Sequence, residues 1–402
     1  MDWIEQNPDK VKRADIVVGI PSYNEADSIT YPTEQAAMGL KKYFSDLRSV
    51  IINCDNNSPD GTKEAFFSTN SDVPKIYLST PPGVMGKGSN FKNLFQKALD
   101  LKAKGIVVVD ADLKSITPQW IKKLGEPIFQ GYNYVAPIYI RHKFDGTITN
   151  NIAYPMTRAL YGQRIRQPIG GDFGLSGKLA KTYMAQKNWS GNVTRFGIDI
   201  WMTTTAMTRT TKICQAFLGC PKVHRAKDPG KALASMFKDV IETIFTLMME
   251  HADFWRRIVW SKPTPIFGFG LGEDEKPPPV LVDEKNLYDK FIKGGEDFEK
   301  TWEKVLTTNN CRKLWEVMNV PEESFEFPSL LWAKILYNYA LVFRDGQADR
   351  DELLESLIPM YFGRVRSYVQ NTQWMEVRQA EDYIEQQCIV FEEAKHQLCK
   401  TW

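Results

Sequence analysis

The sequence predicts an α/β fold, in which a mostly parallel sheet carries helices on both faces and is followed by an all-helical C-terminal domain. Short apolar strands alternate with helical segments up to about residue 235, which is typical of a parallel sheet covered by helices. From about Lys231 the pattern is helical and rich in Trp, Phe, Leu and Glu. The length, 402 residues, also exceeds one ordinary core. We therefore predict two domains, at residues 1–235 and 236–402.

Four apolar strands are expected in the first domain, at residues 15–25 (DIVVGIPSYNE), 49–57 (SVIINCDNN), 74–80 (PKIYLST) and 105–112 (GIVVVDAD). Helical spacing between them predicts helices at residues 34–47, 59–68 and 89–103. In parallel sheets, ligands bind beyond the carboxyl ends of the strands, where the loops gather. We therefore expect the PSYNE, CDNNSPDG and DAD loops to face one crevice.

The second domain is expected to consist of core helices. Its most apolar segments, residues 240–255 and 330–343, are interrupted by Glu242, Glu250 and Lys334. Neither reaches the roughly 18 uninterrupted apolar residues of a membrane span. The Gly- and Pro-rich stretch at residues 268–284 predicts a long loop.

Charge and cysteine usage narrow the class of protein. The 51 basic and 49 acidic residues nearly balance, and no basic stripe indicates nucleic acid as a partner. The six cysteines are scattered without a CxxC pair, which is typical of reduced thiols in a cytoplasmic protein. The first residues, MDWIEQNPDK, do not resemble a secretory signal.

Two carboxylates end the most apolar strand, because Asp110 and Asp112 directly follow three valines. Residues i and i+2 of a strand point to the same side, so both side chains can converge on one hard cation. Magnesium and manganese take oxygen ligands of this kind, together with substrate phosphates. The alternative is a pair of solvated aspartates or a helix N-cap.

Two further loops contain candidate ligand contacts. The segment Gly83 to Asn93 (GVMGKGSNFKN) precedes a helix, so its glycines, Lys87 and the free N–H groups of the helix could bind a phosphate. The alternative is a turn with a solvated lysine, since the Walker spacing is absent. Asp55 at the end of its strand is a candidate ligand contact, whereas Ser58 and Asp60 are best explained as helix caps.

The remaining candidate ligand contacts are three residues that lie later in the chain. Asp172 lies in a glycine-rich segment (RQPIGGDFGLSG), where a carboxylate could accept hydrogen bonds from sugar hydroxyls. Asp199 precedes a helix (RFGIDIWMTTTAM) and could instead be its N-cap. His224 (PKVHRAKD) could complete a carboxylate metal site as a neutral imidazole, although a single histidine is more often structural.

The ordered motifs PSYNE, CDNNSPDGT, GKG, DAD, QPIGGD, FGID and VHR resemble those of the GT-A (Rossmann-like) nucleotide-sugar glycosyltransferases over roughly residues 14–230. The resemblance narrows to the retaining group of mannosylglycerate synthase, glucosylglycerate synthase and glucosyl-3-phosphoglycerate synthase. In that group a helical domain follows the catalytic one. The resemblance implies a metal-dependent hexosyltransferase, with a nucleoside-diphosphate hexose (UDP-, GDP- or ADP-linked) as donor and Mg or Mn as cofactor.

The resemblance also implies roles for individual residues. The divalent cation would be held by Asp112 and His224, and the catalytic acids Asp172 and Asp199 would hold donor-sugar hydroxyls or position the acceptor. The donor nucleotide would be bound by Pro21, Tyr23, Asn24, Glu25, Asp55, Gly86, Lys87 and Asp110, the last contacting the ribose or the metal shell. The acceptor would be bound by Arg141, Asp145, Thr149, Gly170 and Gly171.

The acceptor implied by the resemblance is D-glycerate. An arginine fork such as Arg141 fits a carboxylate bidentately. The phosphoglycerate enzymes carry an arginine where this chain has Thr147, which favours free glycerate over 3-phosphoglycerate. Arg158, Arg164 or Arg166 could still supply a phosphate site. Lys227 stands where mannosylglycerate synthase would have a tyrosine, so the donor sugar, glucose or mannose, stays open.

We therefore expect a cytoplasmic enzyme that transfers a hexose with retention to the 2-hydroxyl of D-glycerate, making a glycosylglycerate compatible solute. Same-face attack is the expected mechanism, because no acid stands out as a nucleophile. The alternatives are a glucosyl-3-phosphoglycerate synthase, an inverting GT-A transferase with a lipid or polysaccharide acceptor, and a non-catalytic nucleotide-binding scaffold. A homodimer is expected only by analogy, and neither a nucleic acid nor a membrane span is expected.

Overall fold

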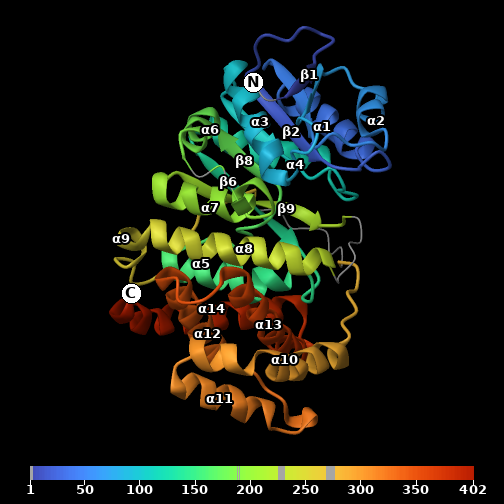
Figure 1. Ribbon diagram of the computed structural model, residues 1–402. Coiled ribbons are helices and arrows are strands. Elements are labelled where there is room, and N and C mark those ends of the chain that lie inside the picture. The colour runs from blue at the N-terminus through green and yellow to red at the C-terminus, as the bar shows by residue number, and fades with distance from the viewer. Residues whose placement is uncertain (1–2, 188, 190, 225–230, 269–276) are drawn as a thin grey trace. The chain divides into compact units, whose positions relative to one another are not determined.

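The computed structural model describes residues 3–187, 189, 191–224, 231–268 and 277–402 (Figure 1). The chain divides into two compact units, each assembled from three stretches. The first comprises Met1–Ile140, Ile165–Asp228 and Thr264–Pro278, and the second comprises Arg141–Arg164, Pro229–Pro263 and Pro279–Trp402. A single cut after residue 235, as expected from the sequence, falls inside helix α8 (Lys231–Glu250).

The described residues of the first unit form a nine-stranded sheet with the strand order β1-β4-β3-β2-β5-β8-β6-β9-β11. In this order the strands are Ile4–Gln6, Lys75–Ser79, Ser49–Asp55, Ile16–Ser22, Gly105–Val108, Phe173–Ser176, Tyr134–Ile140, Ile213–Pro221 and Ile266–Phe267. Neighbouring strands are parallel except at β1, which pairs antiparallel with β4, and at β8, which pairs antiparallel with β5 and β6. The predicted mostly parallel sheet is confirmed.

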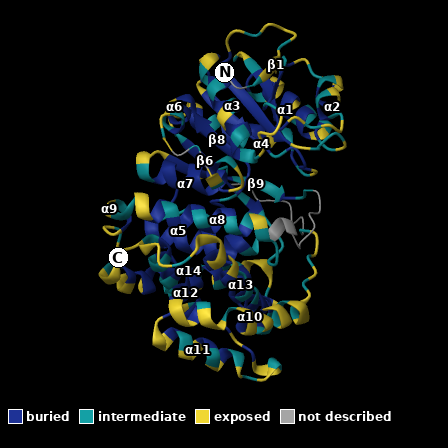
Figure 2. Ribbon diagram, viewed as in Figure 1, coloured by how far each residue is buried: buried dark blue, intermediate teal, exposed yellow. Residues whose placement is uncertain are grey.

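Helices cover both faces of this sheet, as predicted. They are α1 (Thr30–Tyr43), α2 (Thr62–Ser68), α3 (Lys87–Asp100), α4 (Pro118–Phe129), α6 (Gly177–Met184) and α7 (Ile198–Arg209), with the short 3-10 helix η2 (Gly191–Thr194). Ile16, Val18 and Ile20 of β2 pack in one core with α1 and α4. Gly19, which points the other way because side chains alternate along a strand, lies against Leu94 of α3. Figure 2 shows the central strand β2 in the dark blue of buried residues.

The parallel register brings the strand ends to one edge of the sheet. Ser22 at the end of β2 lies opposite Asp55 at the end of β3. Val108, the last residue of β5, lies opposite Gly19 of β2. Because these three strands run in the same direction, the loops that follow them leave at the same edge. This edge carries the predicted PSYNE, CDNNSPDG and DAD loops.

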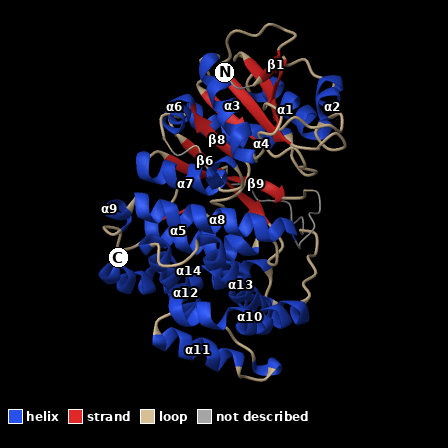
Figure 3. Cartoon of the chain, in the orientation of Figure 1, coloured by secondary structure: helices blue, strands red, loops and turns tan. Residues whose placement is uncertain are grey.

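The second unit is almost entirely helical, as Figure 3 shows. Its elements are η1 (a π-helix, Thr149–Ala153), α5 (Tyr154–Tyr161), β7 (Gln163–Arg164), α8, α9 (Ala252–Trp255), β10 (Lys262–Pro263), α10 (Glu284–Val305), α11 (Thr308–Met318), η3 (a 3-10 helix, Glu322–Ser324), α12 (Ser329–Asp345), α13 (Arg350–Thr372) and α14 (Val377–Thr401). The predicted helical C-terminal region is confirmed. The segment 141–164, which the sequence analysis placed in the first domain, packs with these helices. In the part of the chain that the structure describes, no helix is long and apolar enough to cross a membrane.

Buried charges join segment 141–164 to the other helices of its unit. Arg158 of α5 is 2% exposed and donates to Glu392 of α14 at 2.7 Å and to Ser261 at 3.0 Å. It also forms an ion pair with Glu385 of α14. An ionised group removed from water is tolerated only with such partners. The need to pair Arg158 therefore assigns α5 to the helical unit.

We expect Glu392→Gln to destabilise the protein, because it leaves the Arg158 guanidinium with one buried counter-charge fewer. The free energy of unfolding should fall by about 3 kcal/mol, the usual cost of removing one partner of a buried ion pair. Urea denaturation followed by circular dichroism measures this change. The exposed neighbour Glu393 is the matched control, and Glu393→Gln should stay within about 0.5 kcal/mol of the wild type. Equal stabilities of the two variants would contradict the role of the pair.

Candidate active site

Asp110 lies between two lysines at the edge of the sheet where β2, β3 and β5 end. The Lys87 ammonium, on the first residue of α3, is 2.9 Å from Asp110 Oδ1. The Lys222 ammonium, one residue beyond β9, is 3.1 Å from Asp110 Oδ2. The side chain of Asp110 keeps 23% of its surface exposed, whereas that of Lys222 keeps 4%. Asp110 is thus held from the protein side and still reaches solvent.

Asp172 is fully buried behind Asp110. Its Oδ1 accepts a hydrogen bond from the backbone N–H of Asp110 at 2.9 Å. Its Oδ2 accepts from the Lys222 ammonium at 2.8 Å and from the hydroxyl of Tyr139 on β6. Burial raises the pKa of Asp172, and the positive charge of Lys222 opposes that rise. Protein donors therefore occupy both oxygens of a carboxylate that has no exposed surface.

Asp199 lies in the first turn of α7, and its two oxygens differ. Oδ2 accepts from Lys87 at 3.1 Å, whereas Oδ1 is buried and has no hydrogen-bond partner. Burial is the main cause that raises the pKa of Asp199, and Lys87 opposes it. Burial would lower the pKa of Lys87, but Asp110 and Asp199 raise it above its ordinary value. An unpaired buried acceptor is costly, so Oδ1 is well suited to accept a hydrogen bond from a ligand hydroxyl.

Glycines allow the loops to approach these side chains closely. Gly171 has φ +85°, and a Cβ atom there would lie 2.3 Å from Asp110 Oδ2. A Cβ atom on Gly86 would lie 2.2 Å from the carbonyl oxygen of Thr194, in the turn that leads into α7. Gly171 is therefore explained by close packing against Asp110, and Gly86 by close packing against the backbone of Thr194. This packing does not depend on a phosphate.

The PSYNE loop follows β2 and is attached to the loop that follows β3. The backbone N–H of Asn24, a residue with φ +56°, donates to Ser58 Oγ at 2.8 Å. The N–H of Glu25 donates to Thr62 Oγ1 at 2.9 Å. Tyr23 is 45% exposed, so its ring is available to a ligand. Pro21, the other residue predicted in this loop, lies within β2 itself, and its backbone is opposite Cys54 of β3.

Asp55 is a fully buried link between these loops. It accepts hydrogen bonds from Ser22 at 2.8 Å, from Tyr77 at 2.8 Å and from the hydroxyl and N–H of Ser58, both at 2.7 Å. A nucleotide contact would have to replace one of these donors. The contacts make Asp55 an organiser of the loop edge, and its predicted role at the nucleotide stays a prediction.

Asp112 and His224 belong to adjacent backbone segments. Leu113 and His224 form an isolated antiparallel bridge, and the N–H of Lys114 donates to the carbonyl of Val223 at 2.8 Å. Asp112 is 5% exposed. A carboxylate and an imidazole suit Mg²⁺ or Mn²⁺ when substrate oxygens add ligands. In the described ranges no group of three or more His, Cys, Asp or Glu side chains is arranged to hold a metal ion.

The predicted acceptor residues are divided between the units. Gly170 and Gly171 belong to the first unit, and Arg141, Asp145 and Thr149 belong to the second. Within the second unit, Arg141 Nη1 is 3.7 Å from Asp145 Oδ2, and Thr149 begins η1 as a buried residue.

Other residues discussed for acceptor or donor choice also have defined surroundings. The hydroxyl of Thr147 is 2.6 Å from that of Tyr361 on α13, within the second unit. Arg164 donates to Ser261 at 3.2 Å, and the N–H of Arg166 in the first unit donates to Gln215 at 2.7 Å. Lys227 lies outside the described residues.

Two residues at this site, Lys222 and Tyr139, did not emerge from the sequence. Tyr139 is one of several aromatic residues in an apolar strand and carries no motif. Lys222 lies two residues before His224 in the sequence. This closeness to a predicted metal ligand is the sequence feature that could have indicated Lys222 as a site residue. Its pairing with Asp110 and Asp172 depends on β9 lying beside β6, which the sequence pattern does not show.

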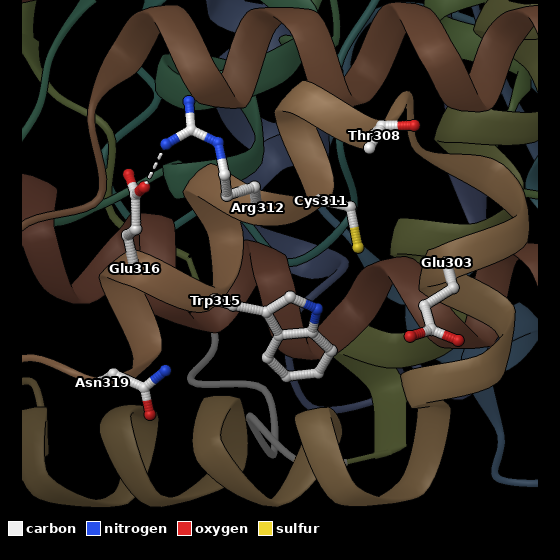
Figure 4. Close-up of a pocket in the computed structure, with 7 residues that line it drawn as sticks. All are labelled: Glu303, Thr308, Cys311, Arg312, Trp315, Glu316 and Asn319. Carbon is white, nitrogen blue, oxygen red and sulfur yellow. Dashed lines mark hydrogen bonds and ion pairs between the residues drawn. The ribbon is translucent and has the colours of Figure 1, made fainter.

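A separate hollow of about 780 Å³ lies on α10 and α11 in the second unit (Figure 4). Its charged lining residues Arg312 and Glu316 pair with each other at 2.6 Å. The others are Glu303, Thr308, Cys311, Trp315 and Asn319. None of these residues was predicted as part of the site.

Comparison with known proteins gives one family match, in the N-terminal part of the chain. Residues 17–182 match the family model for glycosyl transferase family 2. The predicted glycosyltransferase class is supported by this match, and the mostly parallel sheet agrees with the predicted fold class. Among curated proteins, none has a significantly similar sequence.

Several solved structures are similar to parts of the chain. Glucosyl-3-phosphoglycerate synthase from Mycobacterium tuberculosis, in complex with Mn²⁺, UDP and glucosyl-3-phosphoglycerate, is 20% identical, with a TM-score of 0.47 over 58% of this chain and 80% of that chain. A complex of the same enzyme with Mn²⁺, UDP-glucose and phosphoglyceric acid is 21% identical, with a TM-score of 0.48 over 67% and 88%. A structure described as a mycobacterial protein is 22% identical, with a TM-score of 0.44 over 59% and 74%.

We expect Gly171→Ala to reduce activity far more than its matched control, Gly131→Ala. Both glycines have positive φ angles, +85° and +100°, but only at position 171 would a Cβ atom meet another residue, Asp110. Each variant should therefore lose about 1 kcal/mol of stability from backbone strain. Displacement of Asp110 should cost Gly171→Ala about 100-fold in kcat/KM. Steady-state kinetics and thermal melts measure both effects, and equal activities of the two variants would refute the packing argument.

We expect Asp199→Asn to keep or raise stability at pH 7 while transferase activity falls. Burial raises the folded-state pKa of Asp199 above its unfolded value of about 3.9. Between these two pKa values the folded state binds more protons than the unfolded state. The free energy of unfolding of the wild type therefore falls as pH rises through this range. An amide does not ionise, so the gain in Tm over the wild type should appear above about pH 4 and vanish below it. Loss of a charged acceptor should reduce kcat/KM about tenfold or more.

Calorimetry between pH 3.5 and pH 8 checks this dependence. Asp46→Asn, at an exposed carboxylate of the same unit, should show no such pH-dependent gain. A Tm of Asp199→Asn below that of the wild type at pH 7 would contradict the expectation.

Proposed function

We propose that this protein is a retaining, metal-dependent hexosyltransferase that transfers glucose or mannose from a nucleoside diphosphate to the 2-hydroxyl of D-glycerate. The observation that carries the proposal is the convergence of Asp110, Lys87 and Asp199 at the loop edge of a glycosyltransferase sheet. A ligand at this edge would meet a partly exposed carboxylate, a lysine and an unpaired buried oxygen. A diphosphate sugar offers a complementary set of anionic oxygens and hydroxyl donors.

The donor would lie along the edge of loops. The nucleotide is assigned to Pro21, Tyr23, Asn24, Glu25, Asp55, Gly86, Lys87 and Asp110. The exposure of Tyr23 and the position of Lys87 at the N-terminus of a 14-residue helix support this assignment. Free N–H groups at a helix N-terminus and a lysine both favour phosphate oxygens. The sugar is assigned to Asp199, whose unpaired Oδ1 can accept a hydrogen bond from a sugar hydroxyl.

The divalent cation would be held by Asp112 and His224. When bound there with the donor diphosphate, Mg²⁺ or Mn²⁺ supplies Lewis-acid stabilisation of the negative charge that develops on the leaving group. The chemical match of a carboxylate and an imidazole on adjacent backbone segments supports this assignment.

The remaining steps use the chain's own residues and the two substrates. The Lys87 ammonium stabilises the departing diphosphate, and it does so more strongly as charge accumulates. The 2-hydroxyl oxygen of glycerate bonds to the anomeric carbon on the face from which the diphosphate oxygen departs. The hydroxyl proton passes to the diphosphate, so the configuration is retained without a protein nucleophile.

D-Glycerate is favoured over 3-phosphoglycerate by the arginines. Arg158, one candidate for a phosphate site, is buried and already paired with Glu385 and Glu392. A phosphate would have to displace these carboxylates. Arg141 keeps 15% of its side chain exposed, and a guanidinium fork matches a carboxylate bidentately, which supports a role for Arg141 at the glycerate carboxylate. Asp145 and Thr149 would bind the hydroxyls.

The product would be a glycosylglycerate, a compatible solute, and we assign the enzyme to the cytoplasm. The six cysteines support this compartment, because none of them, all within the described residues, forms a disulfide bond. A homodimer stays an expectation by analogy.

A panel of UDP-, GDP- and ADP-hexoses with D-glycerate or 3-phosphoglycerate tests the proposed reaction. Nucleoside diphosphate should be released only when D-glycerate and a divalent cation are both present, and NMR of the product should show the anomeric configuration of the donor. Faster release with 3-phosphoglycerate than with D-glycerate would show that the proposed acceptor is wrong. Release with no pair would favour the scaffold alternative.

Asp112→Ala and His224→Ala should each lower turnover by at least about 100-fold, as expected for loss of a metal ligand or its charge. Both variants should also lose Mn²⁺-dependent UDP binding in calorimetry, with a Tm within a few degrees of the wild type. Cys220→Ala, a change at a half-buried thiol of the same unit, is the control and should bind UDP normally. Unimpaired binding by either site variant would show that the proposed ligand pair is wrong.

A further inference from the structure

Asp172 and Lys222 form a buried pair whose contacts are all directed at the protein. Asp172 has no exposed surface, and its oxygens accept from Asp110, Lys222 and Tyr139. The Lys222 ammonium donates to Asp110, to Asp172 and, at 2.8 Å, to the carbonyl of Gly170. The hydroxyl of Tyr139 is a fourth acceptor, at 3.4 Å, so protein acceptors are sufficient for all three donor hydrogens of the ammonium.

The contacts of this pair converge on one residue, Asp110. Asp172 binds its backbone N–H, and Lys222 binds its Oδ2. Gly171, next to Asp172, leaves space for the same Oδ2. Asp110 is the member of the group with the largest exposed side-chain fraction, 23% against 0% for Asp172 and 4% for Lys222. The buried members therefore support the exposed one.

We propose that Asp172 and Lys222 are positioning residues that hold the DAD loop, through Asp110, in the conformation that binds the metal–nucleotide complex. This inference rests on the proposed function, and it changes the role of Asp172 from a contact of the donor sugar to a support beneath the loop. Asp110 is two residues from Asp112, so a shift of its backbone moves the proposed metal ligand as well. Supporting contacts of this kind usually affect metal affinity or activity 10–100-fold.

The location of Lys222 explains why a cation is needed there. Asp110 and Asp172 approach each other closely enough to share one ammonium, at 3.1 and 2.8 Å. Two carboxylates at such separations repel each other unless a positive charge lies between them. The ring of Tyr139, with its centroid 4.8 Å from the ammonium, closes the other side. The same contacts exclude water from the pair and fix its geometry.

Lys222→Met tests the proposal, because it keeps an unbranched side chain only slightly shorter than that of lysine and removes the charge. The half-saturating Mn²⁺ concentration for UDP binding, measured by calorimetry, should rise about tenfold, and kcat should fall about 100-fold while the KM for D-glycerate stays constant. Lys222→Arg keeps the charge and should recover at least tenfold of the lost kcat. Lys123→Met is the matched control, since Lys123 is a partly buried lysine of the same unit that donates to the carbonyl of Leu218; it should bind Mn²⁺–UDP like the wild type.

Tyr139→Phe keeps the test decisive if Lys222→Met does not fold. It removes the hydroxyl that donates to Asp172. The half-saturating Mn²⁺ concentration should rise about threefold at an unchanged Tm. This is less than the 10–100-fold effect typical of losing a residue that orients a metal ligand, because Lys222 still pairs with Asp172. Wild-type Mn²⁺ dependence in Tyr139→Phe, or in a folded Lys222→Met, would overturn the proposal. The binding measurement does not require transfer, so a wild type that binds Mn²⁺–UDP but transfers no hexose to glycerate would refute only the proposed acceptor reaction.

Discussion

The site depends on the sharing of two ammonium groups among three buried or half-buried carboxylates. Lys87 lies between Asp110 and Asp199, and Lys222 lies between Asp110 and Asp172. Without these cations the acids would repel one another, and burial would favour their neutral forms. The arrangement lets the fold hold several acids together in a poorly solvated place. It also leaves one buried oxygen of Asp199 without a hydrogen-bond partner.

The parallel register of the sheet makes that sharing possible. Strands β2, β3 and β5 end at one edge, and the hydrogen bonds of Asp55 and Ser58 connect the loops that follow. Antiparallel β8 then delivers the residue before it, Asp172, to the backbone of Asp110. The one reversed strand in the middle of a parallel sheet is therefore what brings the QPIGGD segment to the DAD loop. A regular parallel strand at this position would start at the opposite edge.

The helical unit uses buried charge for a different purpose. Arg158 pairs with two glutamates of α14, and Lys395 of the same helix donates to the carbonyls of Ala159 and Ile258. Lys395 thereby bonds a carbonyl in the last turn of α5, and both side chains join segments that are far apart in the sequence. No ligand is needed to explain them. The contrast with Asp199 distinguishes a charged cluster that is satisfied internally from one that is not.

The sequence by itself determined the class of the sheet, its strand-end loops and most of the acids. Apolar strands that alternate with helices require a covered parallel sheet, and the ends of such strands meet at one edge whatever the details. The motif order around Asp110, Asp112, Asp172 and His224 also indicated a glycosyltransferase, a class that the family match bears out.

Only the tertiary structure decided which acids are supports and which are exposed. Asp55 and Asp172 are conspicuous in their motifs, yet both are fully buried with every oxygen bonded. Lys222 has no motif, yet it holds two of the acids together. Segment 141–164 reads as part of the first domain and packs with the helical unit. The reason is the same in each case: periodicity reports local burial, whereas the partner of a buried charge is set by contacts between residues far apart in the chain.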